Sequence, residues 1–424
     1  MDPAKLPRWH LPDRVSSRFV DTSPAGLKFH VLESVPDQPP EPESGSNKSL
    51  PPLILLLHGF PNLSYDWRYV LPKLAAGGCY AVAFDLRGFG RTHNADLTPI
   101  PDCAIHPMAA VCDVVTLVHA LGYTTIRTLV GHDLGAYMAA ITALVRPDMV
   151  ESLLLLAHTW KGIANVPLGA SPAKALASRV PRPLPRRWEG DHDPHIQASL
   201  ARLDPPRKHY KWDNASPGAA DEWTYPAGPP LREFLRGYFH LKSGAHAQKI
   251  PPRPLKSWTA QELAILPHYY VMRADKTMRE NVALDMREEP RQVAEGLSGT
   301  PWLAETDVDV YEREFTRTTF RAPLLWYRVL TDPERSRDLL CLAGSKIRIP
   351  AKYVSGVGDW GTYQIPGGLE AMQEGVSVEP ECWRGATLVP GAGHWVNVEK
   401  PDESALEILE LARSVASKPL ASRG

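Results

Sequence analysis

Short apolar runs alternate with longer amphipathic segments along the first third of the chain. The runs have the length and the bounding residues of buried β-strands, and they lie at 53–59, at the start of 79–92, at 126–131 and at 152–158. Between them, residues 108–121 and 136–147 repeat apolar positions at helical spacing, and the second of these segments stops at a proline. This alternation predicts a mostly parallel sheet that is covered by helices on both faces.

The alternation stops after residue 159, where the composition changes. Residues 160–230 are rich in Pro, Arg, Asp and Gly, and helical patterns return later, in the stretches LREFLRGYFHL and FRAPLLWYRVL. Strand-like runs reappear at 351–358 and 385–394. We therefore expect one α/β core that is interrupted by an inserted helical cap with a Pro-rich segment. The expected parts are core residues 1–159, cap residues 160–340 and core residues 341–424.

Composition and charge narrow the class of protein further. The formal net charge is −1, which gives no indication of a nucleic-acid partner or of an anionic membrane surface. No apolar run approaches the roughly 20 residues that a membrane-spanning helix needs. The five cysteines are scattered and form no C-x-x-C pair, and neither end of the chain carries a recognisable secretory or targeting signal. We expect reduced thiols and a cytoplasmic protein.

Two polar stretches of the Pro-rich segment contain residues that bind ligands in other settings. DHDPH, residues 191–195, holds His and Asp side chains, but its spacing fits no zinc template. The basic run RVPRPLPRR has the charge to contact an acidic partner. Solvated loops explain both stretches more simply, so we predict neither a metal site nor an acidic partner there.

The stretch LVGHDLGAYMAA, residues 129–140, has the sequence of a nucleophile elbow with Asp133 at its centre. In a G-x-nucleophile-x-G turn between a strand and a helix, the glycines allow a sharp bend and the central side chain stands exposed above the sheet. The following helix directs its N-terminus towards the site, which favours negative charge there. The alternative interpretation is an aspartate that merely caps this helix, and the rest of the chain argues against it.

Three further motifs follow predicted strands. HGFP, residues 58–61, ends the first apolar strand, where this architecture supplies an amide to an oxyanion hole. The oxyanion donors would be the N–H groups of Phe60 and Leu134. Asp359 follows the strand before the last, and His394 follows the last strand, which gives the chain order nucleophile, acid, histidine. All of these groups stand at the carboxyl ends of strands, where the sites of open α/β sheets lie.

Asp133 suits substitution at a saturated carbon better than a serine would. A serine that attacked a saturated carbon would be left as a stable ether, whereas a carboxylate forms an ester that water can hydrolyse. His394 would be the general base that activates this water, and Asp359 would orient the imidazole and stabilise its cation. These steps need no metal ion and no organic cofactor.

These motifs resemble those of the epoxide hydrolase family within the α/β-hydrolase fold. The resemblance rests on HGFP, GHDLGA, GDWGTYQ and GAGHW, spans roughly residues 15–415, and identifies the inserted segment as a helical cap. It also implies two cap tyrosines that bind the epoxide oxygen. They are Tyr327, in FRAPLLWYRVL, and Tyr270, in LPHYYVMRADK, with Tyr269 and Tyr238 as alternatives to Tyr270. Further substrate contacts are expected from Pro61, Trp326 and Trp360.

Two other interpretations stay open. Haloalkane and fluoroacetate dehalogenases use the same aspartate chemistry, but they usually carry Trp or Arg directly after the nucleophile, where this chain has Leu134. Together with Phe60 and Tyr327, this position favours a small-molecule epoxide over a halide. A non-catalytic binding protein of the same fold is the second alternative, and the complete triad argues against it. The sequence leaves the oligomeric state open.

Overall fold

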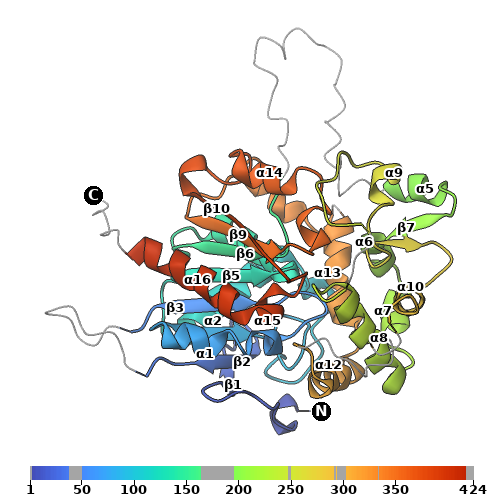
Figure 1. The fold of residues 1–424 in the computed structure, drawn as a ribbon. Coiled ribbons are helices and arrows are strands. Elements are labelled where there is room, and N and C mark those ends of the chain that lie inside the picture. The colour runs from blue at the N-terminus through green and yellow to red at the C-terminus, as the bar shows by residue number, and fades with distance from the viewer. Residues whose placement is uncertain are drawn as a thin grey trace, which may run out of the picture.

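An eight-stranded sheet forms the centre of the protein (Figure 1). The computed structural model describes residues 2–37, 50–163, 195–246, 250–290, 293, 302–332 and 334–416. The strands lie side by side in the order β1-β2-β4-β3-β5-β6-β9-β10. Their bounds are β1 Ser16–Asp21, β2 Lys28–Ser34, β3 Leu53–Leu57, β4 Tyr80–Phe84, β5 Thr128–His132, β6 Leu153–Leu156, β9 Ala351–Gly356 and β10 Trp383–Val389.

Most of this sheet is parallel, as the apolar runs predict. The strands from β4 through β10 pair in parallel, whereas β1 and β2 join one edge in antiparallel pairing. All residues of β3, β5 and β6 are buried, which is why these strands are recognisable as continuous apolar runs. The edge strand β1 is largely exposed, so its sequence lacks that signal and the hydrophobic pattern does not predict it.

The helices of the core cover both faces of the sheet. Their bounds are α1 Leu71–Ala76, α2 Pro107–Ala120, α3 Leu134–Val145, α14 Gly368–Gln373, α15 Val396–Glu399 and α16 Pro401–Ala416, and the short 3-10 turns are η1 Pro3–Lys5, η2 Ser64–Trp67, η3 Asp102–Ala104, η4 Arg337–Leu342, η5 Trp360–Thr362 and η6 Pro380–Cys382. α1 packs against α16, and α2 packs against α3. The chain leaves β3 for β4 through α1, then returns past β3 to β5 through α2. Because such crossovers are right-handed, connections that run in opposite directions place their helices on opposite faces.

This reversal of direction determines where a site can form. β3 and β5 are neighbours in the sheet; the connection after β3 leads to β4 on one side, and the connection after β5 leads to β6 on the other. Loops that leave the carboxyl ends of β3 and β5 therefore diverge and open a crevice between them. The HGFP loop after β3 and the elbow after β5 are the two loops that border this crevice.

A largely helical unit, residues 195–331, lies beside one end of the sheet (Figure 1), and we call it the cap. Its bounds are α5 His195–Ala201, β7 Arg207–His209, α6 Tyr210–Asn214, α7 Ala219–Thr224, α8 Pro229–Leu241, α9 Ala260–Leu263, β8 Val271–Arg273, α10 Met278–Met286, α12 Glu305–Thr318 and α13 Arg321–Thr331. The predicted start of the inserted segment at residue 160 stays a prediction, because residues 164–194 lie outside the described residues. The same holds for DHDPH except for its last residue. No helix of the described residues has the length and apolar character needed to cross a membrane.

Buried charges fix the cap on the core. Arg91 of the core donates to Glu314 of α12 at 2.7 Å, and Trp9 donates to the same carboxylate at 3.1 Å. Arg68 pairs with Asp307 of α12 at 2.9 Å, at a site that is almost closed to solvent. Removing one partner of such a buried pair leaves an uncompensated charge and typically costs about 3–5 kcal/mol. These pairs therefore hold the cap in a defined position over the core.

Candidate active site

Asp133 occupies a backbone conformation that is rare for a residue with a side chain. Its φ is 51° and its ψ is −117°, between the end of β5 and the start of α3. The turn is tight, because a Cβ on Gly131 would lie 2.3 Å from the carbonyl oxygen of Gly135. The carboxylate makes no capping hydrogen bond to α3. The helix-cap interpretation is therefore wrong, and the geometry is that of an elbow which presents its central side chain.

The loop after β3 contacts this carboxylate directly. The N–H of Phe60 donates to Asp133 Oδ1 at 2.9 Å. A Cβ on Gly59 would lie 2.4 Å from Asp133 Cβ, so the close approach of the two loops depends on this glycine. Leu134 is the first residue of α3, and an N–H in the first turn of a helix has no partner within the helix. Both amides assigned to the oxyanion hole therefore lie beside Asp133.

His394 lies between the two predicted aspartates. Its Nδ1 is 3.1 Å from Asp359 Oδ1, and its Nε2 is 3.4 Å from Asp133 Oδ2. Asp359 is buried and accepts hydrogen bonds from the Ser355 hydroxyl at 2.8 Å and from the N–H of Gly361 at 2.6 Å. The structure thus brings the nucleophile, histidine and acid of the sequence analysis together. The carboxylate oxygen that faces His394 is not the one held by Phe60.

The charges of the triad support one another. Burial opposes ionisation of Asp133, but the adjacent His394 and the more distant Lys242 hold its pKa below the ordinary value. Burial and Lys242 disfavour the protonated form of His394, yet the carboxylates of Asp359 and Asp133 raise its pKa. The pKa of Asp359 is lowered in spite of burial, because His394 and the Gly361 N–H stabilise the carboxylate. Relative to the isolated side chains, the site therefore favours the charged forms of all three groups.

Hydrogen bonds from the core and the cap hold the loop that carries His394. His394 donates its N–H to the carbonyl of Lys242 in the cap at 2.8 Å, and its own carbonyl lies 2.8 Å from Nε2 of His132. Glu399 of α15 accepts from the N–H groups on both sides of His394, at 3.0 Å from Gly393 and at 3.1 Å from Trp395. The imidazole is thus fixed by contacts with the core and the cap, although its loop contains two glycines.

Several buried tyrosines of the cap gather near the triad. The ring of Tyr327, on α13, lies 5.2 Å from the ring of Phe60 and 5.7 Å from the ring of Tyr210. The ring of Tyr270 also contacts the ring of Tyr210, at 5.1 Å. The charge of Asp133 contributes to raising the pKa values of both Tyr327 and Tyr238, after the larger effect of burial. Tyr327, Tyr270 and Tyr238 are candidates from the sequence, whereas Tyr210 has no sequence signal that predicts it.

The hydroxyl groups of these tyrosines differ in their partners. Tyr210 donates to Gln364 at 3.0 Å, and Tyr238 accepts from the ammonium of Lys242 at 3.4 Å. The hydroxyl of Tyr270 is buried without a hydrogen-bond partner among the described residues. A buried hydroxyl without a hydrogen-bond partner lowers the stability of the protein. A substrate with an oxygen that accepts a hydrogen bond from Tyr270 would therefore bind more tightly. Tyr270 thus offers a free donor, whereas Tyr210 offers direct contact with Tyr327.

The other residues expected to contact substrate lie in different surroundings. Pro61 and Leu134 are buried beside the loop of Phe60 and the elbow, respectively. Trp360 is buried next to Asp359, at the start of η5. Trp326 is fully buried, and its indole N–H points towards the carbonyl of Arg87 in the core at 3.4 Å. Tyr327 reaches the tyrosine cluster, whereas the indole of Trp326 joins the cap to the core.

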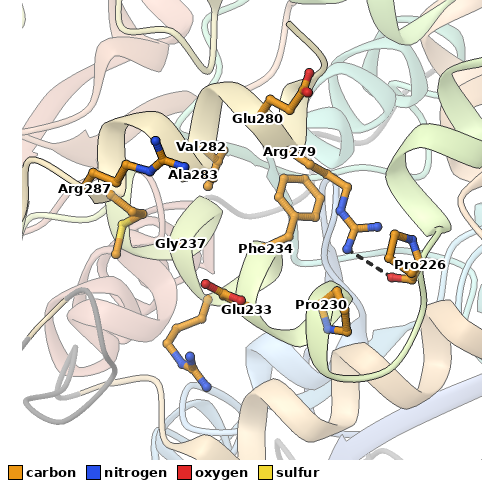
Figure 2. Close-up of a pocket in the computed structure, with 12 residues that line it drawn as sticks. Pro226, Pro230, Glu233, Phe234, Gly237, Arg279, Glu280, Val282, Ala283 and Arg287 are labelled. Carbon is orange, nitrogen blue, oxygen red and sulfur yellow. Dashed lines mark hydrogen bonds between the residues drawn. The ribbon is translucent and has the colours of Figure 1, made fainter.

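Two features of the cap lie apart from the triad. A groove of about 430 Å³ runs between α8 and α10, and it is bordered by Phe234, Arg279 and other cap residues but by no triad residue (Figure 2). His240, His246 and Glu289 gather their ligand atoms within 4.8 Å. Each imidazole lies 2.8 Å from one oxygen of Glu289, so this cluster has mutual hydrogen bonds without a metal ion.

Comparisons with known proteins agree with this architecture. A family model described as alpha/beta hydrolase fold matches residues 52–297. The chain is 27% identical over 388 residues to Epoxide hydrolase B of Mycobacterium tuberculosis, an alignment that covers 91% of this chain and 95% of the relative. It is 27% identical over 360 residues to Epoxide hydrolase 2 of Siraitia grosvenorii, which covers 83% of this chain and 89% of the relative.

Solved structures show the same likeness in three dimensions. An epoxide hydrolase from an endophytic Streptomyces has a TM-score of 0.68 and 26% identity, covering 96% of this chain and 97% of the other. Epoxide Hydrolase A from Mycobacterium thermoresistibile has a TM-score of 0.65 and 24% identity, covering 94% and 98%. The second likeness is one of fold. Both likenesses extend over core and cap together, because they cover nearly the whole chain.

Proposed function

Since this chain belongs to the alpha/beta hydrolase fold family, we propose that it is an epoxide hydrolase which converts a small-molecule epoxide to a vicinal diol. One observation carries the proposal: the elbow presents a carboxylate, Asp133, beside a paired His394, below a cap with buried phenol groups. A carboxylate nucleophile suits attack at a saturated carbon, and phenols suit protonation of a leaving oxygen. The names of the relatives point to the same reaction.

In the first step Asp133 forms an ester with substrate. Oδ2, the oxygen that Phe60 does not hold, attacks an epoxide carbon, and the carbon–oxygen bond breaks with its electron pair moving to oxygen. Tyr327 and a second tyrosine donate hydrogen bonds to that oxygen, and one of them transfers its proton. Without such donors the leaving group would be a bare alkoxide.

In the second step water hydrolyses the ester. His394 takes a proton from water, which attacks the carbonyl carbon of the Asp133 ester, and Asp359 stabilises the imidazolium. Oδ1 becomes the oxyanion, and the Phe60 N–H at 2.9 Å is already aimed at it. Loss of one such donor typically costs about 3 kcal/mol of transition-state stabilisation. Collapse of the intermediate breaks the bond between the carbonyl carbon and Oδ2, which leaves with the diol. The leaving oxygen takes the remaining proton of the added water, and the proton on His394 returns to the phenolate.

Esterification also switches the histidine to its basic form. In the resting state the charge of Asp133 helps to raise the pKa of His394. The ester is neutral, so this effect disappears when the covalent intermediate forms. The imidazole then loses its proton more readily, at the stage that needs a base.

Substitution of His394 by Gln tests the covalent step. The variant should still form the ester but not hydrolyse it, so incubation with a panel of aryl and alkyl epoxides should raise the intact mass by one substrate. Peptide mapping should place the adduct on Asp133. The matched control, which also carries Asp133→Asn, should stay unmodified. If no epoxide of a broad panel modifies the first variant and the wild-type protein forms no diol, the proposal is wrong.

Three single variants decide which tyrosines donate. Tyr327→Phe should slow adduct formation about 100-fold or more while substrate binding remains, because the loss of general acid assistance affects the transition state. Tyr210 and Tyr270 are the two candidates for the second donor, Tyr210 because it contacts Tyr327 and Tyr270 because its hydroxyl is free. Tyr210→Phe and Tyr270→Phe test them separately. The variant that loses more of the rate of adduct formation identifies the second donor. Equal, small losses for all three variants would remove the tyrosines from the mechanism.

The alternative leaving group is a halide. Halides are held by N–H donors, and the side chain of Leu134 after the nucleophile provides none. Incubation of the wild-type protein with haloalkanes and fluoroacetate should therefore release no halide. The proposed location is the cytoplasm, which is supported by five free cysteines in the described part of the chain.

A further inference from the structure

Lys242 stands out as a buried cation inside the site. Lys242 directly follows α8, and it is only 3% exposed. The ammonium contacts a phenol hydroxyl and aromatic faces rather than a carboxylate within the described part of the chain. Burying an ammonium without an adjacent carboxylate is unfavourable. Such a side chain calls for a role that outweighs its cost to stability.

The surroundings of the ammonium are those of the reacting groups. Nζ lies 5.1 Å from the ring centre of Tyr238 and 4.9 Å from that of Tyr270, with its hydrogen bond to the Tyr238 hydroxyl at 3.4 Å. It also lies 5.1 Å from the ring of Trp395, next to the catalytic histidine. The ammonium faces titratable groups from α8, from the β8 side of the cap and from the core loops. They are Tyr238, Tyr269, Tyr270, His394, Asp133 and Asp359.

The backbone of Lys242 has a separate task from its side chain. Its carbonyl accepts the N–H of His394 at 2.8 Å, and any residue at this position supplies that carbonyl. A change of side chain therefore leaves the support of the histidine loop in place. What the lysine adds is the charge.

From this placement we propose that Lys242 is a positioning residue whose ammonium is the counter-charge to the phenolate created by ring opening, acting through the cap tyrosines. The inference rests on the proposed function. Before the reaction the negative charge lies on Asp133, and ester formation neutralises it. The proton transferred to the epoxide oxygen leaves a negative charge on a tyrosine. The ammonium attracts charge at both places, and because it donates to the Tyr238 hydroxyl and lies over the ring of Tyr270 it favours the second.

The magnitude follows from the distances. Two opposite unit charges about 5 Å apart attract each other strongly at the effective dielectric of about 20 found in protein sites. Losing this attraction in the transition state would slow ester formation considerably. Part of the attraction is already present in the resting state through Asp133, so the difference is smaller. We expect loss of the charge to slow ester formation about 100-fold, equivalent to ~2.7 kcal/mol in activation free energy. Burial lowers the pKa of Lys242 to about 8, against the opposing attraction of Asp133 and Asp359, so the cation is lost in a pH range that can be measured.

The test is carried out in the His394→Gln background, where ester formation is the only step. Ester formation is followed by intact mass in single-turnover reactions between pH 6 and 10. The parent should be fast and should slow as pH rises through about 8 or somewhat above, because removing His394 takes away a neighbouring cation. Lys242→Met should be about 100-fold slower and should lack that decline. Lys242→Arg, which stays charged throughout, should be close to the parent rate at pH 7 and should also lack the decline.

A purely structural role predicts another result. It would lower the melting temperature of Lys242→Met but leave its rate and pH profile like those of the parent, and that outcome overturns the proposal. If the Met variant does not fold, Lys242→Gln takes its place. A decline of the rate with pH that persists in Lys242→Arg also contradicts the proposal. Absence of any adduct in the parent refutes the proposed function and this inference with it. A normal parent together with an unaffected Met variant refutes the inference alone.

Discussion

Glu399 permits a quantitative prediction about the support of the His394 loop. Glu399 is partly buried at the end of α15, and its carboxylate accepts hydrogen bonds from the N–H groups of Gly244, Gly393 and Trp395, at 2.7, 3.0 and 3.1 Å. Burial raises its pKa to about 7 from the ordinary value of 4.5, although these N–H groups oppose the rise. The perturbation we consider is Glu399→Gln, which keeps the shape of the side chain and removes its ability to ionise.

The sign and size follow from proton linkage. Below pH 4.5 the group is protonated in both folded and unfolded chains and contributes no pH dependence. Between 4.5 and 7 the unfolded chain releases the proton while the folded chain retains it, so stability falls as pH rises. The gap between the two pKa values corresponds to about 3 kcal/mol. Above pH 7 both states are ionised and the effect is constant. Glu399→Gln should abolish this decline.

Urea unfolding at pH 4, 5.5, 6.5 and 7.5 measures the effect, since each curve gives a free energy of unfolding. The difference between Glu399→Gln and wild type should move by about 3 kcal/mol in favour of the variant across this range. Glu403→Gln is the matched control, because Glu403 is an exposed residue of α16, and its curves should run parallel to wild type. A difference that stays constant with pH would show that Glu399 is ionised in the folded protein near its ordinary pKa and would refute the reasoning.

Three further predictions concern the elbow and the triad. Asp359→Asn should form the ester but slow its hydrolysis by about 10⁴-fold, so the adduct should accumulate during turnover in intact-mass spectra; rapid release would contradict the orienting role. Gly135→Ala should cost at least about 3 kcal/mol in thermal or urea unfolding, because its Cβ would lie 2.5 Å from backbone oxygens of the β3 loop; normal stability would mean that the loops can separate. Asp133→Asn, a neutral mimic of the ester, should lower the pKa of His394 in imidazole NMR titrations, and an unchanged value would disprove the proposed switch.

The sequence allowed the core and the triad to be predicted because their signals are local. A buried parallel strand is a continuous apolar run, and each functional loop follows such a run directly. The run predicted at 126–131 corresponds to β5, Thr128–His132, and the helix predicted at 136–147 corresponds to α3, Leu134–Val145. Asp133 could be identified because it interrupts a known turn pattern at the junction of these two elements. The chain order then limited the choice of acid and histidine.

Other parts of the site depend on contacts between distant segments and have no local signal. Tyr210 and Lys242 come from cap helices whose composition resembles that of any amphipathic helix. Their proximity to Asp133 arises only when the cap is folded over the sheet. Tyr238 and Tyr270 were recognised as candidates, but their order of contact with Tyr327 is a property of packing. The exposed strand β1 shows the same limit, because an edge strand need not be apolar.

The choice of aspartate at the elbow links these observations. A serine is neutral before and after it acts, so its reaction would leave the charges around it unchanged. The charge of Asp133 helps to raise the pKa of His394 in the resting state, and it disappears when the ester forms. In the proposed mechanism the same event creates negative charge on a cap tyrosine, near the ammonium of Lys242. One displacement of charge would thus release the base for the second step, and the buried ammonium would stabilise it during the first. An enzyme of this design needs its cap closed over the core, since the attractions are strong only where water is excluded.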